Sequence, residues 1–581
     1  MQTLLNKHNL VAETKFHLKS FILIVKRQLQ NSVSRISQFS NKGQLKGQQV
    51  ISFSESGLWN KDDNAQNWIL TAGKIENLRI AVKRLNGIEV PANQTFSFWK
   101  HVGNPNLGKG YVVGREIREG CIIPTVAGGL CQLSNALYDA ALKANFEIIE
   151  RHKHTKVIKG SLAEKDRDAT VKWNYVDLRF KSTHAFRIEA ELSFDKLIVK
   201  FKSAEKATLP VNASNTLLQS SKLNDCYSCG NFACFKHPDR TNAKQEKAIA
   251  TFILDERWIE YEDYIKSVAT DKDFFIVPMT KTSFLKTNRF NWNLDNPENI
   301  KALTLASLQR AVRLRLLSKS KSNIFSLMLG FDKNVADAAA QYIPIESTHV
   351  VVSQNLLPFI WASGALGGRT FDVLMNRLPI EKLHQRLDLA HANHPESKTL
   401  NDFRAPESLV DLENTALTKS RSIITPHHEI ADIFNNKSIR LNWQLPAEVT
   451  KTETHGNKIL FPASALGRKG AYEIKKLAKE LNLSIVVLGK AEEDLNFWKD
   501  VNIEMTGANP FEEIGLVVYP TYVEHQPRIL LKAVAAGLSV ITTTACGLVP
   551  GNNLTIVPIG DYKTLKEAVL HQLAIRSPSK V

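Results

Sequence analysis

Short apolar runs alternate with helical stretches through the second half of this 581-residue chain, and this alternation constrains its fold more than any other feature. Eight runs have the length and composition of buried strands: 248–254, 274–278, 348–352, 422–425, 458–461, 484–489, 514–519 and 539–543. Helical stretches lie between them, at 303–317, 472–481 and 528–536, and we expect a last helix from Tyr562 that crosses back to the first domain. This order predicts an α/β multidomain protein with parallel sheets, in two Rossmann-type domains over residues 246–445 and 446–581.

The strongest local motif is the segment 519–541, which reads as strand, loop, helix, glycine stop and strand. Pro527 suits the first turn of the helix, and Gly537 suits the position just after its end. The loop directs Glu524 and the amides of the helix N-terminus toward the carboxyl end of the strand. Doubly wound sheets bind ligands there, and a helix N-terminus favours phosphate.

This motif resembles the donor domain of the GT-B glycosyltransferases that retain anomeric configuration, and the segment 463–470 resembles their diphosphate-contacting loop. The resemblance implies that Glu524 contacts the donor sugar and that Lys469, helped by Arg468, neutralises the diphosphate leaving group. It implies a nucleotide-sugar donor as substrate and no metal in the transfer step. The donor site implied in this way comprises Arg468, Lys469, Gly470, Glu524, Pro527 and Arg528.

Two positions depart from the pattern of that family. The second acidic residue, eight positions beyond the first, is replaced by Lys532, and a lysine cannot accept the hydrogen bonds of ribose hydroxyls. Ser464 stands where an arginine is usual, five residues before the loop lysine. These departures leave the donor open, and they keep open a second reading in which a degenerate transferase fold only binds.

The first half of the chain carries a different set of motifs, with VPANQTFSF at 90–98 and GGLCQLS at 128–134. ERH at 150–152, RDATV at 167–171 and DLRF at 177–180 follow. From about 53 to 203 the sequence resembles the VanW family, which is associated with bacterial cell envelopes and glycopeptide-resistance clusters. The resemblance implies an α+β domain over 51–205 and an envelope context, with Ala127 in place of a third glycine.

Cys131 follows a glycine pair at the predicted N-terminus of a helix, where the helix dipole favours a thiolate. His152 or His154 could serve as its base, and Asp168, expected on a following strand, could orient the imidazole. This order resembles that of transglutaminase-like and papain-like thiol enzymes. Two alternatives stay open, namely a binding site for an envelope precursor and a purely structural turn. Their residues are Gln132, Ser134, Arg151 and His152.

A cluster of four metal-ligand residue types lies in the segment 206–245, which we interpret as a linker. Its spacing is C-x2-C-x4-C-x2-H, formed by Cys226, Cys229, Cys234 and His237. Three thiols and one imidazole match the ligands of a tetrahedral structural zinc site. An iron–sulfur cluster is the less favoured alternative.

The N-terminal segment 1–50 is basic, with eight Lys and Arg residues against the single acidic Glu13, whereas the whole chain carries a net charge of +17. A helix over 15–39 places apolar residues on one face and lysines beside it, as suits an anionic inner membrane leaflet. The alternative is a helix packed on the protein's own core. No apolar run is long enough to span a bilayer, and no secretory signal is evident. We therefore expect a cytoplasmic protein, peripheral on the inner face of the plasma membrane, and no nucleic-acid partner.

These patterns together predict a bacterial, envelope-related, hexosyltransferase-like GT-B enzyme with a VanW-like accessory domain. Its acceptor would be an envelope glycan or a lipid-linked precursor. Two alternatives are a non-catalytic VanW-family sensing protein and a thiol enzyme that depends on Cys131.

Overall fold

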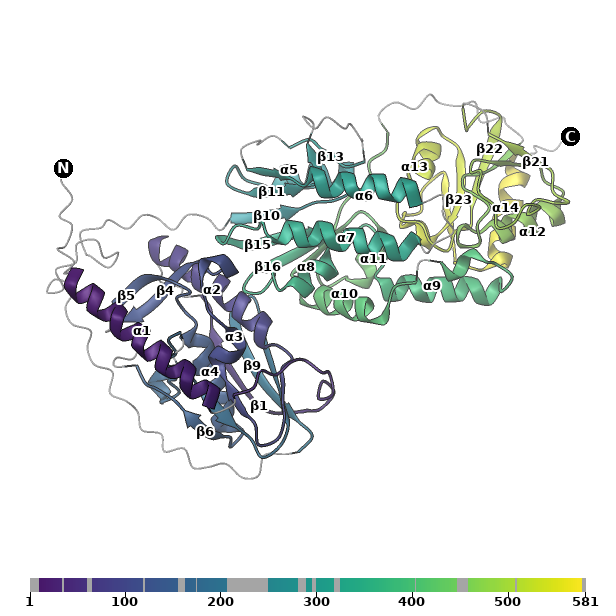
Figure 1. Ribbon diagram of the computed structural model, residues 1–581. Coiled ribbons are helices and arrows are strands. Elements are labelled where there is room, and N and C mark those ends of the chain that lie inside the picture. The colour runs from purple at the N-terminus through teal and green to yellow at the C-terminus, as the bar shows by residue number, and fades with distance from the viewer. Residues whose placement is uncertain are drawn as a thin grey trace, which may run out of the picture. The chain divides into compact units, whose positions relative to one another are not determined.

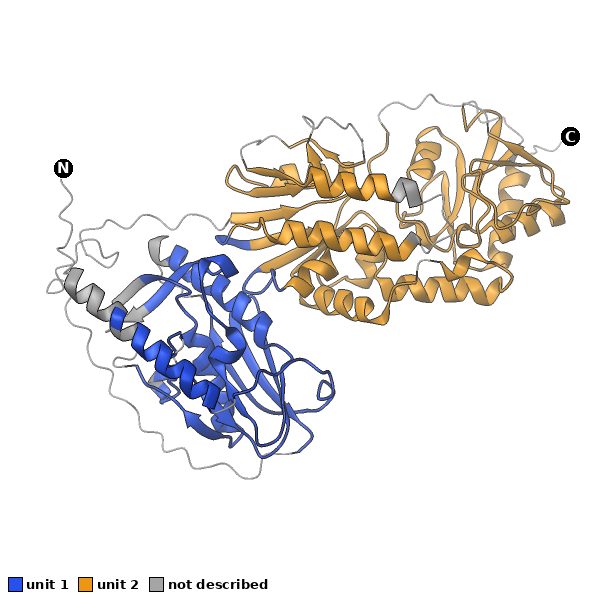
Figure 2. Ribbon diagram, in the orientation of Figure 1, with its two compact units in different colours: residues 1–248, 345–348, 364–369 blue, residues 249–344, 349–363, 370–581 orange. Residues whose placement is uncertain are grey.

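The computed structural model describes residues 10–33, 36–59, 65–118, 121–154, 162–173, 175–205, 249–280, 289–294, 299–317, 324–402, 404–446, 458–506 and 509–576. The chain divides into two compact units (Figure 2). Unit 1 comprises residues 1–248 with the short segments 345–348 and 364–369. Unit 2 comprises 249–344, 349–363 and 370–581.

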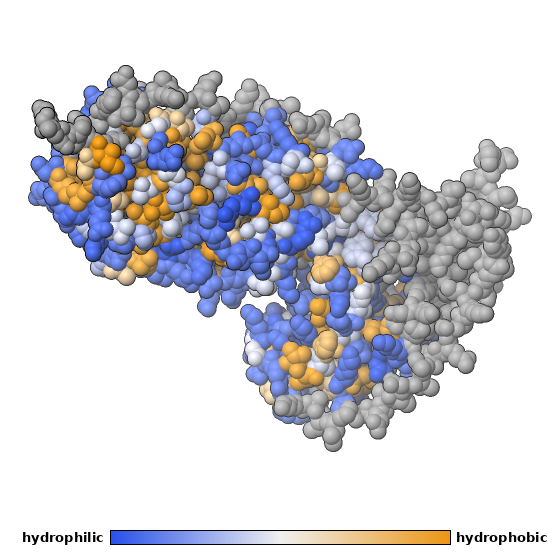
Figure 3. Space-filling view, turned by 180° about the vertical axis from the view of Figure 1, so that it is seen from behind, coloured by the Kyte–Doolittle hydropathy of each residue, from blue (hydrophilic) through white to orange (hydrophobic). Residues whose placement is uncertain are grey.

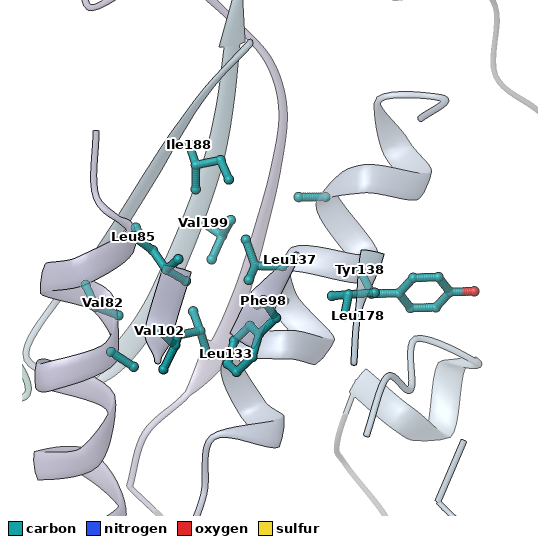
Figure 4. Packing of buried hydrophobic residues seen from close by; sticks show 14 of the residues in the cluster. Val82, Leu85, Phe98, Val102, Leu133, Leu137, Tyr138, Leu178, Ile188 and Val199 are labelled. Atoms are coloured by element: carbon teal, nitrogen blue, oxygen red, sulfur yellow. The ribbon is translucent and has the colours of Figure 1, made fainter. Parts of the chain in front are cut away.

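Unit 1 is an α+β domain whose main sheet is antiparallel, in the order β1-β9-β8-β2. The strands are β1 (Gln49–Gly57), β9 (Lys196–Ser203), β8 (Phe186–Leu192) and β2 (Glu89–Val90). Every second residue of β9 is buried, which gives the sheet one core face. Helices α2 (Ala65–Leu85) and α4 (Cys131–Lys143) pack on the sheet, and Figure 4 shows Val82, Leu85, Leu133 and Leu137 gathered with Ile188 and Val199.

Smaller elements complete unit 1. A three-stranded sheet has the order β3 (Thr95–Ser97), β7 (Arg179–Lys181) and β6 (Glu147–Glu150). A hairpin is formed by β4 (Val113–Arg118) and β5 (Cys121–Val126), with α3 at Phe98–Val102. The predicted helix after the glycine pair is confirmed, because α4 begins at Cys131 itself.

Helix α1 (Leu10–Val33) differs from the predicted helix over 15–39 at both ends. Ile36 is already outside the helix. The run Asn31, Ser32 and Val33 explains the early end, because amide, hydroxyl and β-branched side chains all have low helix propensity. No helix among the described residues is long and apolar enough to cross a membrane.

Unit 2 contains two parallel sheets flanked by helices (Figure 1). The first has the order β14 (Ile300–Ala302), β11 (Phe274–Val277), β10 (Ile249–Ile253), β15 (Ser347–Ser353), β16 (Thr370–Leu374), β17 (Ser422–Thr425) and β18 (Ser438–Arg440). Its helices are α5 (Ile259–Val268), α6 (Thr304–Leu317), α7 (Ile324–Ala340), α8 (Leu357–Ser363), α9 (Ile380–Asn393), α10 (Glu407–Lys419) and α11 (His428–Ile433). A short pair, β12 (Met279–Thr280) and β13 (Asn291–Trp292), lies beside it.

The second sheet has the order β21 (Ile503–Met505), β20 (Ile485–Val487), β19 (Lys458–Phe461), β22 (Ile514–Tyr519), β23 (Ser539–Thr543) and β24 (Leu554–Val557). All of its neighbouring strands pair in parallel. Helices α12 (Ala471–Leu481), α13 (Arg528–Ala535) and α14 (Tyr562–Arg576) accompany it. The predicted α/β fold with two Rossmann-type halves is confirmed.

Unit 2 differs from the sequence-based expectation in several strands and in its last helix. Strands that were not predicted include β14, β16, β18, β21 and β24. The buried Asp372 lies inside β16, paired with Arg421 at 2.5 Å between Oδ2 and Nη2. Helix α14 was expected to cross back to the first domain, but it packs on β23 and β24 of the second sheet. Figure 3 shows hydrophobic residues exposed between hydrophilic ones on the face of the molecule hidden in Figure 1.

The loop before α12 depends on Gly470, and a matched glycine allows this dependence to be measured. Gly470 and Gly537 both have positive φ, of 79° and 85°, but a Cβ on Gly470 would meet the Pro520 carbonyl oxygen at 2.2 Å, whereas a Cβ on Gly537 meets nothing. We expect Gly537→Ala to lower the free energy of unfolding by about 1 kcal/mol, from backbone strain alone. Gly470→Ala should lower it by about 3 kcal/mol, because the overlap adds to the strain.

Hydrogen exchange of peptides from β19 and β22 under increasing urea would measure both changes in unit 2 of the full chain. Equal losses for the two variants would show that the loop carrying Gly470 relaxes without cost.

Candidate functional site

The carboxyl ends of strands from both halves of unit 2 contact one another. His427 follows β17 of the first sheet, and its Nε2 lies 3.2 Å from the Glu524 carbonyl oxygen and 3.1 Å from the Ala545 carbonyl oxygen. The His428 N–H donates to the Gly547 carbonyl at 2.9 Å. Glu524 and Ala545 lie in the segments that follow β22 and β23. These bonds therefore connect the carboxyl ends of strands from the two sheets, where parallel sheets usually bind ligands.

Glu524 is the most strongly held side chain at this edge. Its Oε2 accepts from the Lys469 ammonium at 2.9 Å and from the Tyr519 hydroxyl at 2.6 Å. Its Oε1 accepts from the His525 and Gln526 N–H groups, both at 2.9 Å. Burial alone would raise the pKa of this carboxyl, but the Lys469 charge and the hydrogen bonds outweigh burial and lower the pKa to about 2. Glu524 is therefore a carboxylate at every physiological pH.

The loop that carries Lys469 is fastened to the loop that carries Glu524. The Arg468 carbonyl accepts from the N–H groups of Tyr522 and Val523, at 3.0 and 3.3 Å. The ammonium of Lys469 also donates to the Val523 carbonyl at 3.2 Å. The close approach of Gly470 to Pro520 completes this contact, so the predicted residues Arg468, Lys469, Gly470 and Glu524 do come together.

Arg528 and Lys532, both on α13, have different surroundings. The guanidinium of Arg528 makes two 2.6 Å bonds to the buried carboxylate of Glu260 on α5, and it stacks near Trp258 and Trp443. Pro527 is the N-cap residue of α13. Lys532 is exposed on α13. It stands where the family pattern has its second acidic residue, so α13 offers no carboxylate at this position.

His427 is a buried neutral imidazole. Burial, its largest influence, lowers the pKa of His427 to about 4 despite the two carbonyl acceptors at Nε2. These acceptors require the proton to lie on Nε2, and Nδ1 has no hydrogen-bond partner in the part of the molecule that the structure describes. A Cβ on Gly547 would overlap the imidazole, so the ring fills the space that this glycine leaves.

Sequence reasoning missed a buried charged cluster at the end of β10. Arg310 of α6 binds Asp255 at 2.5 Å through Nη2 and Asp332 of α7 at 3.0 Å through Nη1, and Asn355 donates to Asp255. Burial and the charge of Asp255 raise the pKa of Asp332 to about 7, against the opposing effect of Arg310. A carboxyl that titrates near neutrality is suited to general acid–base chemistry. The position of Asp255 directly after a buried strand was the available signal.

In unit 1 the structure brings together Cys131, His154 and Asp168. Nδ1 of His154 lies 2.5 Å from Oδ1 of the fully buried Asp168, and the His154 N–H donates to Oδ2 at 2.5 Å. Burial lowers the pKa of His154, but the hydrogen bonds and charges of Asp168 and of the Cys131 sulfur raise it to about 10.

The other predicted residues of this region have different partners. His152 is exposed and lies 3.2 Å from Glu150, so the structure favours His154 over His152 as the imidazole beside the thiol. Asp168 lies in an extended segment and not on the expected strand. Gln132 donates to Ser56 and to the Gly57 carbonyl, and Arg151 donates to the Asp168 carbonyl, which are contacts that hold the domain together.

The predicted zinc ligands Cys226, Cys229, Cys234 and His237 lie outside the described residues. Among the residues that are described, no group of three His, Cys, Asp or Glu side chains could hold a metal ion. The zinc site therefore stays a prediction.

Comparison with known proteins identifies a domain within unit 1. Residues 73–202 match the family model described as "VanW like protein", so the chain carries a VanW-like domain over these residues. Two curated bacterial proteins are similar to about a fifth of the chain. The uncharacterised protein YoaR of Bacillus subtilis (strain 168) is 34% identical over 108 residues, which are 19% of this chain and 35% of that protein. The vancomycin B-type resistance protein VanW of Enterococcus faecalis (strain ATCC 700802 / V583) is 31% identical over 137 residues, 22% of this chain and 49% of that protein.

The chain thus spans about a third to a half of the length of these relatives. Solved structures are similar to a larger share of the chain. Sucrose-phosphate synthase from Thermosynechococcus elongatus covers 57% of this chain, over 91% of its own, at 11% identity and a TM-score of 0.33. The lipopolysaccharide outer core galactosyltransferase WaaB covers 57%, over 91% of its own, at 9% identity and a TM-score of 0.34. HepE of Anabaena, solved with UDP and glucose, covers 57%, over 90% of its own, at 11% identity and a TM-score of 0.33. The two Rossmann-type halves of unit 2 follow from its two parallel sheets and not from these similarities.

The neutral state of His427 predicts how the stability of unit 2 depends on pH. The pKa of a histidine is about 6.5 in an unfolded chain and about 4 here, so below pH 6.5 the unfolded state binds a proton that the folded state does not. Stability is complete above pH 6.5 and falls as the pH drops toward 4. We expect a loss of about 2 kcal/mol between pH 7 and pH 5 from this group.

Urea unfolding at the two pH values measures this loss. His427→Gln keeps a donor near the position of Nε2 but cannot titrate, so its pH dependence should be smaller by that amount. His571→Gln, on an exposed position of α14, is the matched control and should behave as the wild type. An unchanged pH dependence in His427→Gln would contradict a neutral buried imidazole.

Proposed function

We propose that unit 2 transfers a hexose from a nucleotide-diphosphate sugar to an envelope glycan or a lipid-linked acceptor. The observation that carries this proposal is the pairing of Glu524 with Lys469 at the joined strand edges. A fixed carboxylate can accept hydrogen bonds from sugar hydroxyls, and a fixed ammonium can neutralise a diphosphate.

The proposed sugar transfer requires mainly that the protein stabilise the charge of the leaving group. When the bond between the sugar and the diphosphate breaks, negative charge develops on the leaving group, and preorganised cations stabilise that charge. Lys469 supplies one cation, and the amides at the N-terminus of α13 add a partial positive charge. Glu524 keeps its three other donors if Lys469 moves to the diphosphate, so the carboxylate does not become unpaired.

The alternative is a transferase fold that binds without turnover. Lys532 in place of the second acid supports this alternative, because the ribose loses an acceptor. The pairing of Arg528 with Glu260 also supports it, since that guanidinium is engaged within the protein. The two functions are distinguished by donor turnover and not by donor affinity.

A membrane-facing role for α1 is supported by the way the helix is held. Arg27 makes two bonds to Glu150 and one to the Tyr175 carbonyl, and Arg179 donates to Asn31, which fixes one face of the helix to unit 1. The opposite face, at helical spacing, exposes apolar side chains of 38–84% exposed fraction: Leu18, Phe21, Ile22, Val25, Leu29 and Val33. We propose that this apolar stripe, with the exposed Lys26 beside it, contacts an anionic bilayer surface on the cytoplasmic side.

Calorimetric titration of the full chain with a panel of nucleotide sugars and free nucleotide diphosphates tests the proposed transferase. We expect one donor to bind and Glu524→Gln to weaken that binding about 10- to 100-fold, as the loss of a charge-assisted hydrogen bond predicts. Lys563→Met, an exposed change on α14, is the control and should bind as the wild type. Release of free nucleotide diphosphate in the presence of acceptor extract would then separate a transferase from a binding protein. Failure of every donor to bind a folded chain would refute both.

Sedimentation with vesicles tests the membrane contact of the full chain. We expect binding to phosphatidylglycerol vesicles that weakens with salt, and at least about a tenfold loss of affinity in Leu29→Glu. Gln28→Glu makes the same change of charge at an exposed position beside the stripe and should bind more nearly as the wild type. Equal affinity for Leu29→Glu and Gln28→Glu would rule out the stripe as the contact surface.

A further inference from the structure

We propose that unit 1 holds a second catalytic site, in which Cys131 attacks the carbonyl of an amide substrate and His154 and Asp168 manage the proton. This site is separate from the Glu524 site of unit 2 and does not depend on the function proposed for it. The substrate class is a peptide-like amide, which the site would cleave through a thioester.

The imidazole of His154 is fixed in orientation by its two bonds to Asp168. One carboxylate oxygen of Asp168 is hydrogen-bonded to Nδ1 of the ring, and the other accepts a hydrogen bond from the backbone N–H of His154. Both the ring and the backbone of His154 are therefore held in place. With Nδ1 engaged, Nε2 is the ring nitrogen that remains to exchange a proton with the Cys131 thiol. The sulfur of Cys131 lies 3.6 Å from Thr170 Oγ1, two residues beyond Asp168, which places it beside the segment that holds His154. A nucleophile, an imidazole and an orienting carboxylate in this order define a thiol triad.

Hydrogen bonds around the site fix the relative positions of the segments that carry Cys131, His154 and Asp168. Ser134 and Asn135 of α4 bind the carbonyl and the N–H of Ala169, at 2.5 and 2.7 Å. The N–H of Thr170 donates to the His152 carbonyl at 2.9 Å. These bonds tie the segment of Asp168 both to the helix that begins at Cys131 and to the segment of His154. Supporting bonds of this kind are what a preorganised catalytic group requires.

The thiol of Cys131 is accessible from the surface and is not buried in the core. Cys131 is part-exposed at the first residue of α4, and its Sγ lies 3.6 Å from Thr170 Oγ1. The dipole at the N-terminus of α4 favours the thiolate form of a cysteine at this position. Gly128 allows the turn that precedes α4, because a Cβ there would meet the Gly114 carbonyl oxygen at 2.6 Å.

Cys546 of unit 2 shows what a structural cysteine looks like in the same chain. It is fully buried, its Sγ contacts the Thr542 hydroxyl at 3.0 Å, and burial raises its pKa above the ordinary range of a thiol. Cys131 differs in exposure, in its position at a helix N-terminus and in its imidazole partner. The cluster is not a metal site either, since no described group of three such side chains fits a metal ion.

The reaction balances with water as the only co-reactant. The Cys131 thiolate forms a bond to the carbonyl carbon, the carbon–nitrogen bond breaks, and the imidazolium of His154 gives its proton to the leaving amine. Neutral His154 then takes a proton from a water molecule as that water attacks the thioester. The carboxylic acid leaves, and the thiolate and imidazolium are restored. Asp168 stays a carboxylate and stabilises the imidazolium in both steps.

Alkylation of the full chain by iodoacetamide between pH 5 and pH 9, mapped by mass spectrometry over all six cysteines, tests the ion pair. We expect Cys131 to react at pH 6 at least about tenfold faster in the wild type than in His154→Gln, because an unassisted thiol ionises near pH 8.5. His152→Gln, two residues away, is the matched control and should leave the rate unchanged. Equal rates in the wild type and His154→Gln would overturn the pairing.

Acylation by p-nitrophenyl acetate tests the catalytic step. We expect a burst of one nitrophenol per chain and an acetyl group on Cys131, with a rate about 100-fold lower in His154→Gln. Added imidazole should restore part of the rate in His154→Gln but not in Cys131→Ala, a result that a purely structural role of His154 does not produce. Circular dichroism and thermal unfolding identify any variant that fails to fold, and Asp168→Asn, which keeps an acceptor for the His154 N–H, provides a second test of the triad. A folded wild type without acetyl-Cys131 would overturn the proposal.

Discussion

The partly buried carboxylate of Glu524 is the constraint on which the organisation of the second half of unit 2 depends. A charged group in this position is costly unless it is paired and hydrogen-bonded, and its partners come from three segments of the chain. Tyr519 ends β22, Lys469 follows β19, and the N–H groups of residues 525 and 526 precede α13. Satisfying one carboxylate therefore sets the relative positions of two loops and a helix, and it also sets the backbone carbonyl that His427 reaches from the first half.

The sequence predicted the inner strands of the second sheet well because these strands are buried on both faces and therefore read as continuous apolar runs. The predicted bounds 458–461, 514–519 and 539–543 are those of β19, β22 and β23. The sequence-based prediction missed β16 because this strand is not a continuous apolar run. That strand contains Asp372, whose charge is balanced by Arg421 and by His349 at 3.2 Å, and these partners are distant in sequence. A long-range ion pair leaves no local periodic signal, so the segment resembled a polar loop.

The same limit applied to the candidate sites. Glu524 and Lys469 could be found because they occupy strand-end loops, which are ligand positions in any doubly wound sheet. Arg310 and Asp332 lie within helices, where charged residues are usually solvated, and only tertiary packing buries them beside Asp255. The sequence alone could not decide whether His152 or His154 lies beside Cys131, because residues two apart in an extended chain point to the same side. The contact of His154 with Asp168, fourteen residues away, makes that choice.

Both proposed sites use a carboxylate that backbone N–H groups hold in place, and the cation opposite each carboxylate decides what the site can do. Lys469 can leave Glu524 for a diphosphate because three donors remain on the carboxylate, so that site is suited to charge stabilisation. The imidazolium of His154 can instead release its proton while Asp168 keeps it oriented, so that site is suited to proton transfer. A lysine in place of His154 would hold the charge but return the proton less readily near neutral pH, since the ordinary pKa of its ammonium is about 10.4. The residue types, more than the shared geometry, therefore separate a group-transfer site from an acyl-transfer site in one chain.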